Sequence, residues 1–169
     1  MNTEYIVKKA NARMELIRRV AKFNVPMKDL RDLYVLFVRS ILEQSAPVWH
    51  SSITQENSKS IERVQKSAVR LILGNNYITY SQGLQKLNLQ TLEDRRIELC
   101  LNFALKCSKD STLSHMFPKY VKEHGMKTRS NQVFKVHHAN TQRYKKSPII
   151  FMQNLLNKEY QIKTEELKK

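Results

Sequence analysis

The sequence contains few of the residues from which enzyme sites are usually built. Its 169 residues include 3 glycines and 2 cysteines. The glycines, at positions 74, 83 and 125, stand too far apart to form a loop that wraps a phosphate. Cys100 and Cys107 would lie about 10 Å apart along one helix, too far for a disulfide or for a shared metal ion. We therefore predict no cofactor, and two reduced thiols that pack in a core.

Carboxylates and histidines are also poorly placed for catalysis. Asp29 and Asp32 stand at the start of a predicted helix, where the helix dipole accounts for them better than a metal site does. His137 and His138 would point to opposite sides of an extended chain, which makes them a poor pair of metal ligands. The sequence predicts no catalytic residue and no metal site.

Long hydrophobic runs are absent as well. The longest strongly apolar run, Leu33 to Val38, is far shorter than the ~20 residues that cross a bilayer. The first residues lack the basic region, apolar stretch and cleavage site of a signal peptide. With reduced cysteines, this predicts a cytoplasmic or nuclear protein that is neither secreted nor membrane-bound.

Positive charge, in contrast, is abundant. The chain has 30 Lys and Arg against 15 Asp and Glu, a formal net charge of +15. Such an excess indicates a polyanionic partner, with nucleic acid as the first candidate and an anionic membrane surface as the second.

The stretch from Leu30 to Gly74 predicts two helices around a corner. The first is apolar nearly all round, so we expect it to lie in the interior. Pro47 is expected to end it, Thr54 to cap the second helix, and Gly74 to close it in a left-handed conformation. The apolar positions of the first helix are Leu30, Leu33, Tyr34, Phe37, Val38, Ile41 and Leu42.

The second helix, about Gln55 to Leu73, separates its apolar residues from its basic ones. Four cations fall within an arc of about 60°, on the side opposite the apolar residues. A row of this kind fits a phosphate backbone, and the alternative is an ordinary solvated face. The apolar residues are Ile61, Val64, Ala68, Leu71 and Ile72, and the cations are Lys59, Arg63, Lys66 and Arg70.

Further helices are predicted on both sides of this stretch. One precedes it with a seven-residue apolar repeat from Val7 to Ala21, a short one covers residues 82–87, and one after Thr91 reaches about Ser108. Ser147 and Pro148 should start a last short helix that ends near Asn157. The helix after Thr91 is expected to bury Leu92, Ile97, Leu99, Cys100, Phe103, Ala104 and Cys107, with Arg95, Arg96 and Lys106 facing elsewhere.

The segment from Lys119 to Lys146 is strongly basic, with Glu123 as its only acid. Residues 132–138 are expected to form a brief strand. The aromatic residues of this region could stack on unpaired bases, or they could pack the segment onto the helices. These aromatic residues are Phe117, Tyr120, Phe134 and Tyr144.

Several segments resemble the C-terminal part of reverse transcriptases from non-LTR retrotransposons and, more loosely, the region after the polymerase palm in jockey-like elements. They are KKANARMELIRRVAKF, LYVLFVRSILEQSAPVWHSSIT and IERVQKSAVRLILG, then LQKLNLQTLEDRRIELCLNFALKC, KTRSNQVFKV and TQRYKKSPIIFMQNLLN. The most specific part is the corner at residues 47–49 with the helix segment that begins at Glu62. The resemblance implies a thumb-like region that helps to hold template and primer. The family's Tyr-X-Asp-Asp turn and further Asp, which carry two metal ions, are not in this sequence, so the resemblance implies a fragment that is not catalytic alone.

We therefore predict an all-α fold. It would comprise a three-helix thumb-like bundle at residues 1–75, a helical extension packed on it at 76–112, and a basic, partly irregular arm with a short C-terminal helix at 113–169.

The predicted function is binding to the backbone of RNA or an RNA–DNA hybrid by electrostatics, with a palm-and-fingers polymerase domain in trans as a further candidate partner. The alternative is a protein-interaction or scaffold remnant of a retroelement, in which the helix that begins at Leu30 meets a partner or a second copy. The predicted contacts are Lys59, Arg63, Lys66 and Arg70 on a duplex, with Lys127, Arg129, Arg143, Lys145 and Lys146 as a second hold.

Overall fold

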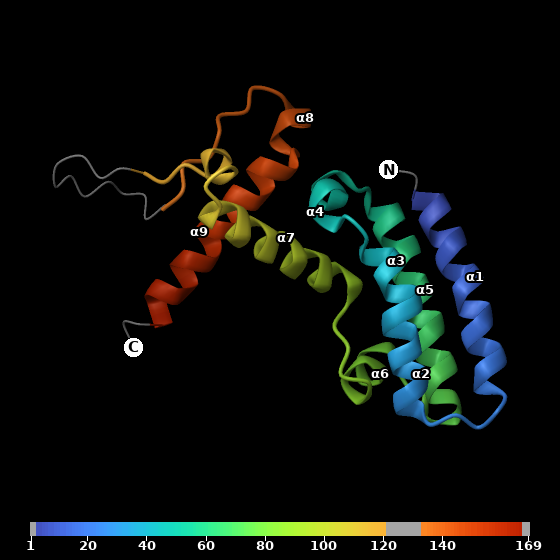
Figure 1. Ribbon diagram of the computed structural model, residues 1–169. Helices are drawn as coiled ribbons and strands as arrows, with labels where there is room; N and C mark the ends of the chain where they lie inside the picture. Colours follow the sequence, from blue (N-terminus) through green and yellow to red (C-terminus); the bar gives the residue numbers. More distant parts are fainter. Residues whose placement is uncertain (1–2, 121–132, 167–169) are drawn as a thin grey trace. The chain divides into compact units, whose positions relative to one another are not determined.

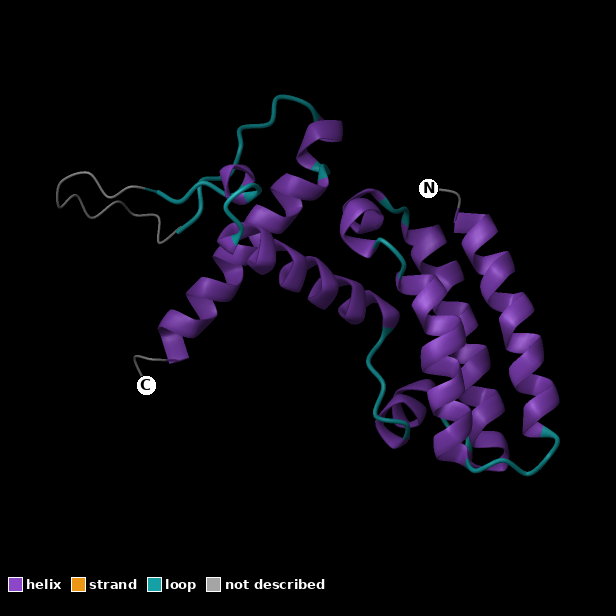
Figure 2. Cartoon of the chain, viewed as in Figure 1, coloured by secondary structure: helices purple, strands orange, loops and turns teal. Residues whose placement is uncertain are grey.

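The computed structural model describes residues 3–120 and 133–166, and this part of the chain is all-α, with no strand (Figures 1 and 2). The predicted fold class is confirmed. None of the helices in the described ranges is long and apolar enough to cross a membrane. The chain divides into two compact units, which we call unit 1 (Met1–Ala46 with Ile53–Arg96) and unit 2 (Pro47–Ser52 with Ile97–Lys169).

Unit 1 is built on three packed helical stretches. The first is α1 (Thr3–Ala21), the second runs through α2 (Met27–Leu33), η1 (Tyr34–Arg39) and α3 (Ser40–Glu43), and the third is α5 (Gln55–Leu73). α1 packs against both of the others, and the three lie side by side in Figure 1. The core between them contains Ala10, Met14, Ile17, Leu30, Tyr34, Val38, Leu42, Ile61, Val64, Ala68 and Ile72.

The second stretch contains a π-helix, η1. The spacing of the buried residues along this stretch explains why a π-helix forms. Leu30, Tyr34, Val38 and Leu42 are buried at intervals of four residues. On an α-helix such positions drift by about 40° at each step. A π-helix has more residues per turn because its hydrogen bonds join residues five apart. The π-helix therefore keeps all four side chains on the core side.

The expectation that this whole stretch lies in the interior is wrong. Leu36 is 67% exposed and Phe37 is 48% exposed, because the four-residue repeat fills the core from one side of the helix only. The stretch also ends at Glu43, before Pro47. Ser45 has a positive φ of 54° that turns the chain, and Pro47 lies inside the next short helix, α4 (Ala46–Trp49).

α5 begins and ends at the residues that the sequence predicts. The Thr54 hydroxyl accepts a hydrogen bond from the Asn57 N–H at 3.2 Å. Gly74 has a positive φ of 50°, although its ψ of −124° differs from that of a left-handed helix.

After η3 (Gly74–Asn76), α6 (Tyr80–Lys86) returns to pack on α5 and begins two residues before the predicted start. Gly83 permits this approach, since a Cβ there would lie 2.5 Å from Val69 Cγ1.

α7 (Leu92–Lys109) begins in unit 1 and continues in unit 2. The Thr91 hydroxyl caps it by accepting from the Asp94 N–H at 3.1 Å, as predicted. Arg96, expected to face elsewhere, has 0% exposure, and its Nη2 donates to Ser58 Oγ at 2.7 Å. Spacing explains the correction, because position 96 lies one turn from both Leu92 and Cys100, which are buried. Phe103, expected in the buried stripe, is exposed.

Unit 2 has its own core between α7 and α9 (Pro148–Glu166). Its short elements are η2 (His50–Ser52), η4 (Ser114–Met116) and α8 (Gln142–Lys145). α9 begins at Pro148 as predicted, but it continues to Glu166 instead of ending near Asn157. The longer helix places Tyr160 in edge contact with Phe134, with ring centroids 5.5 Å apart. The core contains Cys100, Ala104, Cys107, Phe117, Phe134, Met152 and Leu156.

Two side-chain amides of α9 hold the extended chain that packs on it. The Asn157 Oδ1 accepts from the N–H groups of Val133 and Phe134, and its Nδ2 donates to the Phe134 carbonyl. One turn earlier, Gln153 accepts from the His137 N–H and donates to the Met116 carbonyl. The predicted strand is wrong for the described residues 133–138, which form a single antiparallel bridge, Lys119 with Phe134, because α9 amides supply most of the partners. Residue 132 lies outside the described residues.

Replacing Asn157 with Leu should destabilise unit 2 by about 3 kcal/mol or more, since it leaves two N–H groups and one carbonyl without partners. Urea unfolding followed by the fluorescence of Trp49, which belongs to unit 2, measures the change. Asn154→Leu on the exposed side of the same helix is the matched control and should cost less than about 1 kcal/mol. Equal losses in the two variants would contradict this role for Asn157.

Candidate nucleic-acid interface

The four cations predicted on α5 form one exposed row, which we call the α5 stripe. Lys59, Arg63, Lys66 and Arg70 are all exposed, whereas the opposite side of the helix is buried. The separation of the two faces inferred from helical spacing is confirmed. Gln65, Val69 and Leu73 are buried as well, because α6 covers a further side of α5.

No carboxylate forms a salt bridge with the α5 stripe in the described part of the chain. The nearest acid on the same helix, Glu62, accepts hydrogen bonds from Tyr80 and from the Leu92 N–H. The four charges of the stripe therefore remain available to an external anion. Salt bridges in the described part of the chain instead involve Arg18, Arg31, Arg39 and Arg95.

Two tyrosine rings lie beneath one half of the α5 stripe. Lys66 Nζ lies 5.3 Å from the centroid of the Tyr80 ring, and Arg70 Cζ lies 5.3 Å from that of Tyr77. Both distances are within the range of cation–π attraction. Sequence analysis did not identify these tyrosines, because they reach the stripe only through the return of the chain after Gly74.

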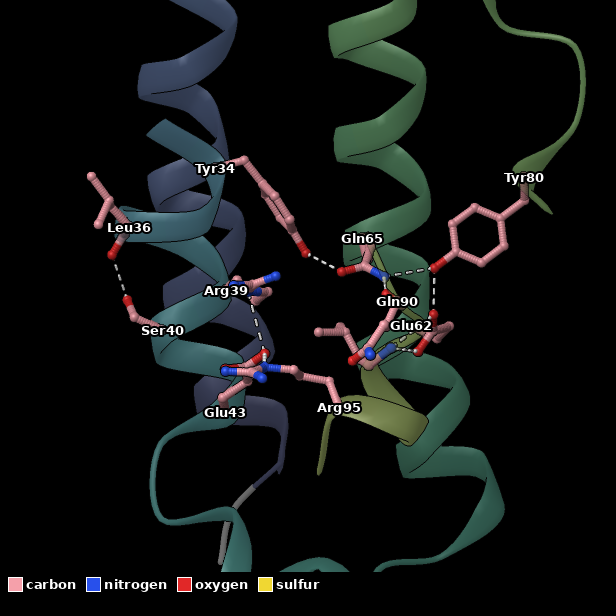
Figure 3. Close-up of polar contacts among 11 residues, drawn as sticks. Tyr34, Leu36, Arg39, Ser40, Glu43, Glu62, Gln65, Tyr80, Gln90 and Arg95 are labelled. Carbon is pink, nitrogen blue, oxygen red and sulfur yellow. Dashed lines mark hydrogen bonds and ion pairs between the residues drawn. The ribbon is translucent and has the colours of Figure 1, made fainter. Parts of the chain in front are cut away.

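A polar network behind the stripe fixes Tyr80 (Figure 3). The Tyr34 hydroxyl donates to Gln65 Oε1 at 2.7 Å, and Gln65 Nε2 donates to the Tyr80 hydroxyl at 3.0 Å and to the Gln90 carbonyl at 2.8 Å. The Tyr80 hydroxyl in turn donates to Glu62. The network joins η1, α5, α6 and the backbone just before α7, so the face of α5 behind the stripe is held by hydrogen bonds as well as by apolar contacts.

This environment affects the ionisation of both tyrosines. Burial, with a smaller contribution from Tyr80, raises the pKa of Tyr34 well above its ordinary value of 10.0. Burial and the hydrogen bond to Glu62 raise the pKa of Tyr80. Both hydroxyls are donors at neutral pH, as in an ordinary tyrosine, and the raised pKa values keep them protonated above pH 10.

A polar groove of about 540 Å³ between α1 and α5 is a poorer site for a polyanion. Its lining includes Glu4 and Glu56 as well as Lys8. Two carboxylates would repel phosphate groups, so the exposed stripe is the better candidate.

Only part of the second predicted group of phosphate-binding cations lies in the described residues. Arg143, Lys145 and Lys146 are exposed on α8 and just after it. Lys127 and Arg129 lie outside the described residues. The structure therefore places three of the five predicted cations on the surface of unit 2.

The aromatic residues of the basic segment divide between the two roles considered for them. Phe117 and Phe134 are buried in the core of unit 2, where they pack the segment onto α7 and α9. Tyr120 and Tyr144 are exposed, and Tyr144 lies on α8 beside Arg143. Only the two tyrosines are accessible to a base.

The described residues contain no group of three or more His, Cys, Asp or Glu side chains that could hold a metal ion. Cys100 and Cys107 are buried in the core of unit 2. Burial, followed by the charge of Asp110, raises the pKa of the Cys107 thiol, which makes it a weak nucleophile. The packing role predicted for both thiols is confirmed.

Comparisons with protein-family models, with curated proteins and with solved structures gave no match.

The stability of unit 1 should fall as the pH rises above 10. Tyr34 and Tyr80 have raised pKa values in the folded state, so above pH 10 the unfolded chain releases protons that the folded chain retains. Their contribution is complete below pH 10 and is lost as the pH approaches the folded values. Urea unfolding followed by circular dichroism at pH 9 to 11 measures the fall. Tyr34→Phe should make it shallower, whereas Tyr144→Phe in unit 2 should not; equal curves for wild type and Tyr34→Phe would contradict the account.

Proposed function

We propose that this chain binds the backbone of RNA or an RNA–DNA hybrid through electrostatic contacts, without base-specific readout. The observation that supports the proposal is the α5 stripe, a row of four exposed cations. None of the four forms a salt bridge with another described residue. Along the helix axis the row spans about 16 Å, which is long enough to meet several phosphates of one strand.

Binding would follow from release of the counterions that surround a nucleic acid. Each Lys or Arg that meets a phosphate displaces a condensed cation, so affinity decreases as salt increases. Contacts with phosphates fix position and orientation but carry no sequence information. The net charge of +15 would attract the nucleic acid before the stripe engages it.

Unit 2 would supply a second group of contacts with the nucleic acid. The exposed cations Arg143, Lys145 and Lys146 can meet further phosphates, and Tyr144 can stack on an unpaired base. The sequence resemblance suggests that the chain is a non-catalytic C-terminal fragment of a retrotransposon RNA-directed DNA polymerase. A palm-and-fingers domain in trans would then supply the chemistry.

The test is the salt dependence of binding to a fluorescein-labelled RNA–DNA hybrid, followed by fluorescence anisotropy. Changing Lys59, Arg63, Lys66 and Arg70 together to Gln should flatten the slope of log affinity against log salt by up to about 3.6, since each of four duplex phosphate contacts contributes about 0.9. The matched control changes two exposed Lys and two exposed Arg of α1, which are Lys8, Lys9, Arg13 and Arg19.

The control variant should alter the slope by less than about 1, because it removes the same positive charge from α1 without removing a proposed contact with a phosphate. Equal flattening in the two variants would show that net charge, and not the α5 stripe, governs binding. Absence of binding at low salt would remove the proposal.

One observation favours a second candidate function, protein interaction. Leu36 and Phe37 are large apolar side chains exposed on neighbouring positions of η1, where a partner or a second copy could cover them. In this case the chain would be a scaffold remnant of a retroelement.

Under this alternative, sedimentation should detect an association that depends on protein concentration. Changing Leu36 and Phe37 together to Ser should reduce its association constant at least about tenfold, because two buried apolar contacts are lost. Changing Leu16 and Phe23, which are exposed on α1 and just after it, is the control. A chain that remains monomeric at every concentration would exclude self-association through this surface.

A further inference from the structure

The α5 stripe consists of two pairs that are chemically alike. Lys59 with Arg63 and Lys66 with Arg70 each contain one Lys and one Arg, four residues apart on the same helix, and all four side chains are exposed. Neither pair forms a salt bridge within the described residues. A count of charges would assign the two pairs equal importance.

The pairs differ in what lies beneath them. Lys66 and Arg70 each lie 5.3 Å from the centroid of a tyrosine ring, Tyr80 and Tyr77 respectively. Among the described residues, no ring lies beneath Lys59 or Arg63. Lys66 and Arg70 are therefore held against the protein surface by rings, whereas Lys59 and Arg63 are exposed without such a contact among the described residues.

The two rings are themselves fixed in place. The Tyr80 hydroxyl donates to Glu62 and accepts from Gln65 Nε2, so its ring cannot swing away without breaking both hydrogen bonds. Tyr77 is half-buried beside Gly83, where a Cβ would lie 3.9 Å from the Tyr77 ring. The hydrogen bond to a carboxylate also increases the electron density of the Tyr80 ring, which strengthens its attraction for a cation.

We propose that Tyr77 and Tyr80 are positioning residues that hold Arg70 and Lys66 ready for phosphate, and that this pair is the primary phosphate site of the stripe. The inference rests on the proposed function. A free Lys or Arg loses rotamer entropy when it contacts a phosphate, which weakens binding. Lys66 and Arg70 lose less on binding, because the rings already restrict them.

The first experiment removes a ring without removing charge. Tyr77→Leu should weaken binding of the labelled RNA–DNA hybrid about two- to fivefold, the effect of one exposed cation–π contact, with the salt slope nearly unchanged. Tyr77→Phe keeps the ring and should bind as wild type does. A purely structural role for Tyr77 would instead lower the melting temperature with no specific loss of affinity. Wild-type affinity in a folded Tyr77→Leu variant would overturn the proposal.

The second experiment compares the two pairs directly, and the four side chains of these pairs are all exposed. Lys66→Gln with Arg70→Gln should weaken binding at least about threefold more than Lys59→Gln with Arg63→Gln does. Tyr77→Leu should then have no further effect in the Arg70→Gln background, because its partner is gone. Equal losses for the two pairs would overturn the inference and leave the proposed function standing. No loss from either pair would overturn both.

Discussion

Burial of one face of α5 is the constraint on which the rest of unit 1 depends. Ile61, Val64 and Ala68 pack against the neighbouring helices, and this fixes the rotation of α5 about its own axis. Once that rotation is fixed, the residues on the other side have to face solvent. The alignment of the four cations therefore follows from the apolar core, and it is this alignment that supports the proposal of a polyanionic partner.

Buried amides determine the structure where helical periodicity does not apply. In unit 1, Gln65 connects Tyr34, Tyr80 and the backbone at Gln90, so the chain that leaves α6 is tied to the centre of α5. In unit 2, Asn157 takes the place of a neighbouring strand for the extended chain at Phe134. Each amide satisfies backbone groups that would otherwise be costly to bury. The two units thus use the same device to order segments of low regularity.

Local patterns in the sequence predict the position of α5, the caps at Thr54 and Thr91 and the exposed stripe, because these depend on spacing along a single helix. Thr54 is an example, since its hydroxyl bonds three residues away. The prediction for Arg96 is wrong, because position 96 lies one turn from the buried Leu92 and Cys100 and is itself buried despite its charge. Tyr77 could not have been placed, because its contact with Arg70 depends on the path of the chain after α5. Long-range contacts of this kind leave no local signal.

We propose that nucleic acid meets the protein at the α5 stripe. The most direct measurement is a nuclear magnetic resonance titration of the protein with an RNA–DNA hybrid, following the side-chain signals of Lys and Arg on α5 and on α1. The account predicts that Lys59, Arg63, Lys66 and Arg70 shift first and furthest, while the cations of α1 change little. Larger shifts on α1 than on α5, or no shift on either helix, would contradict it.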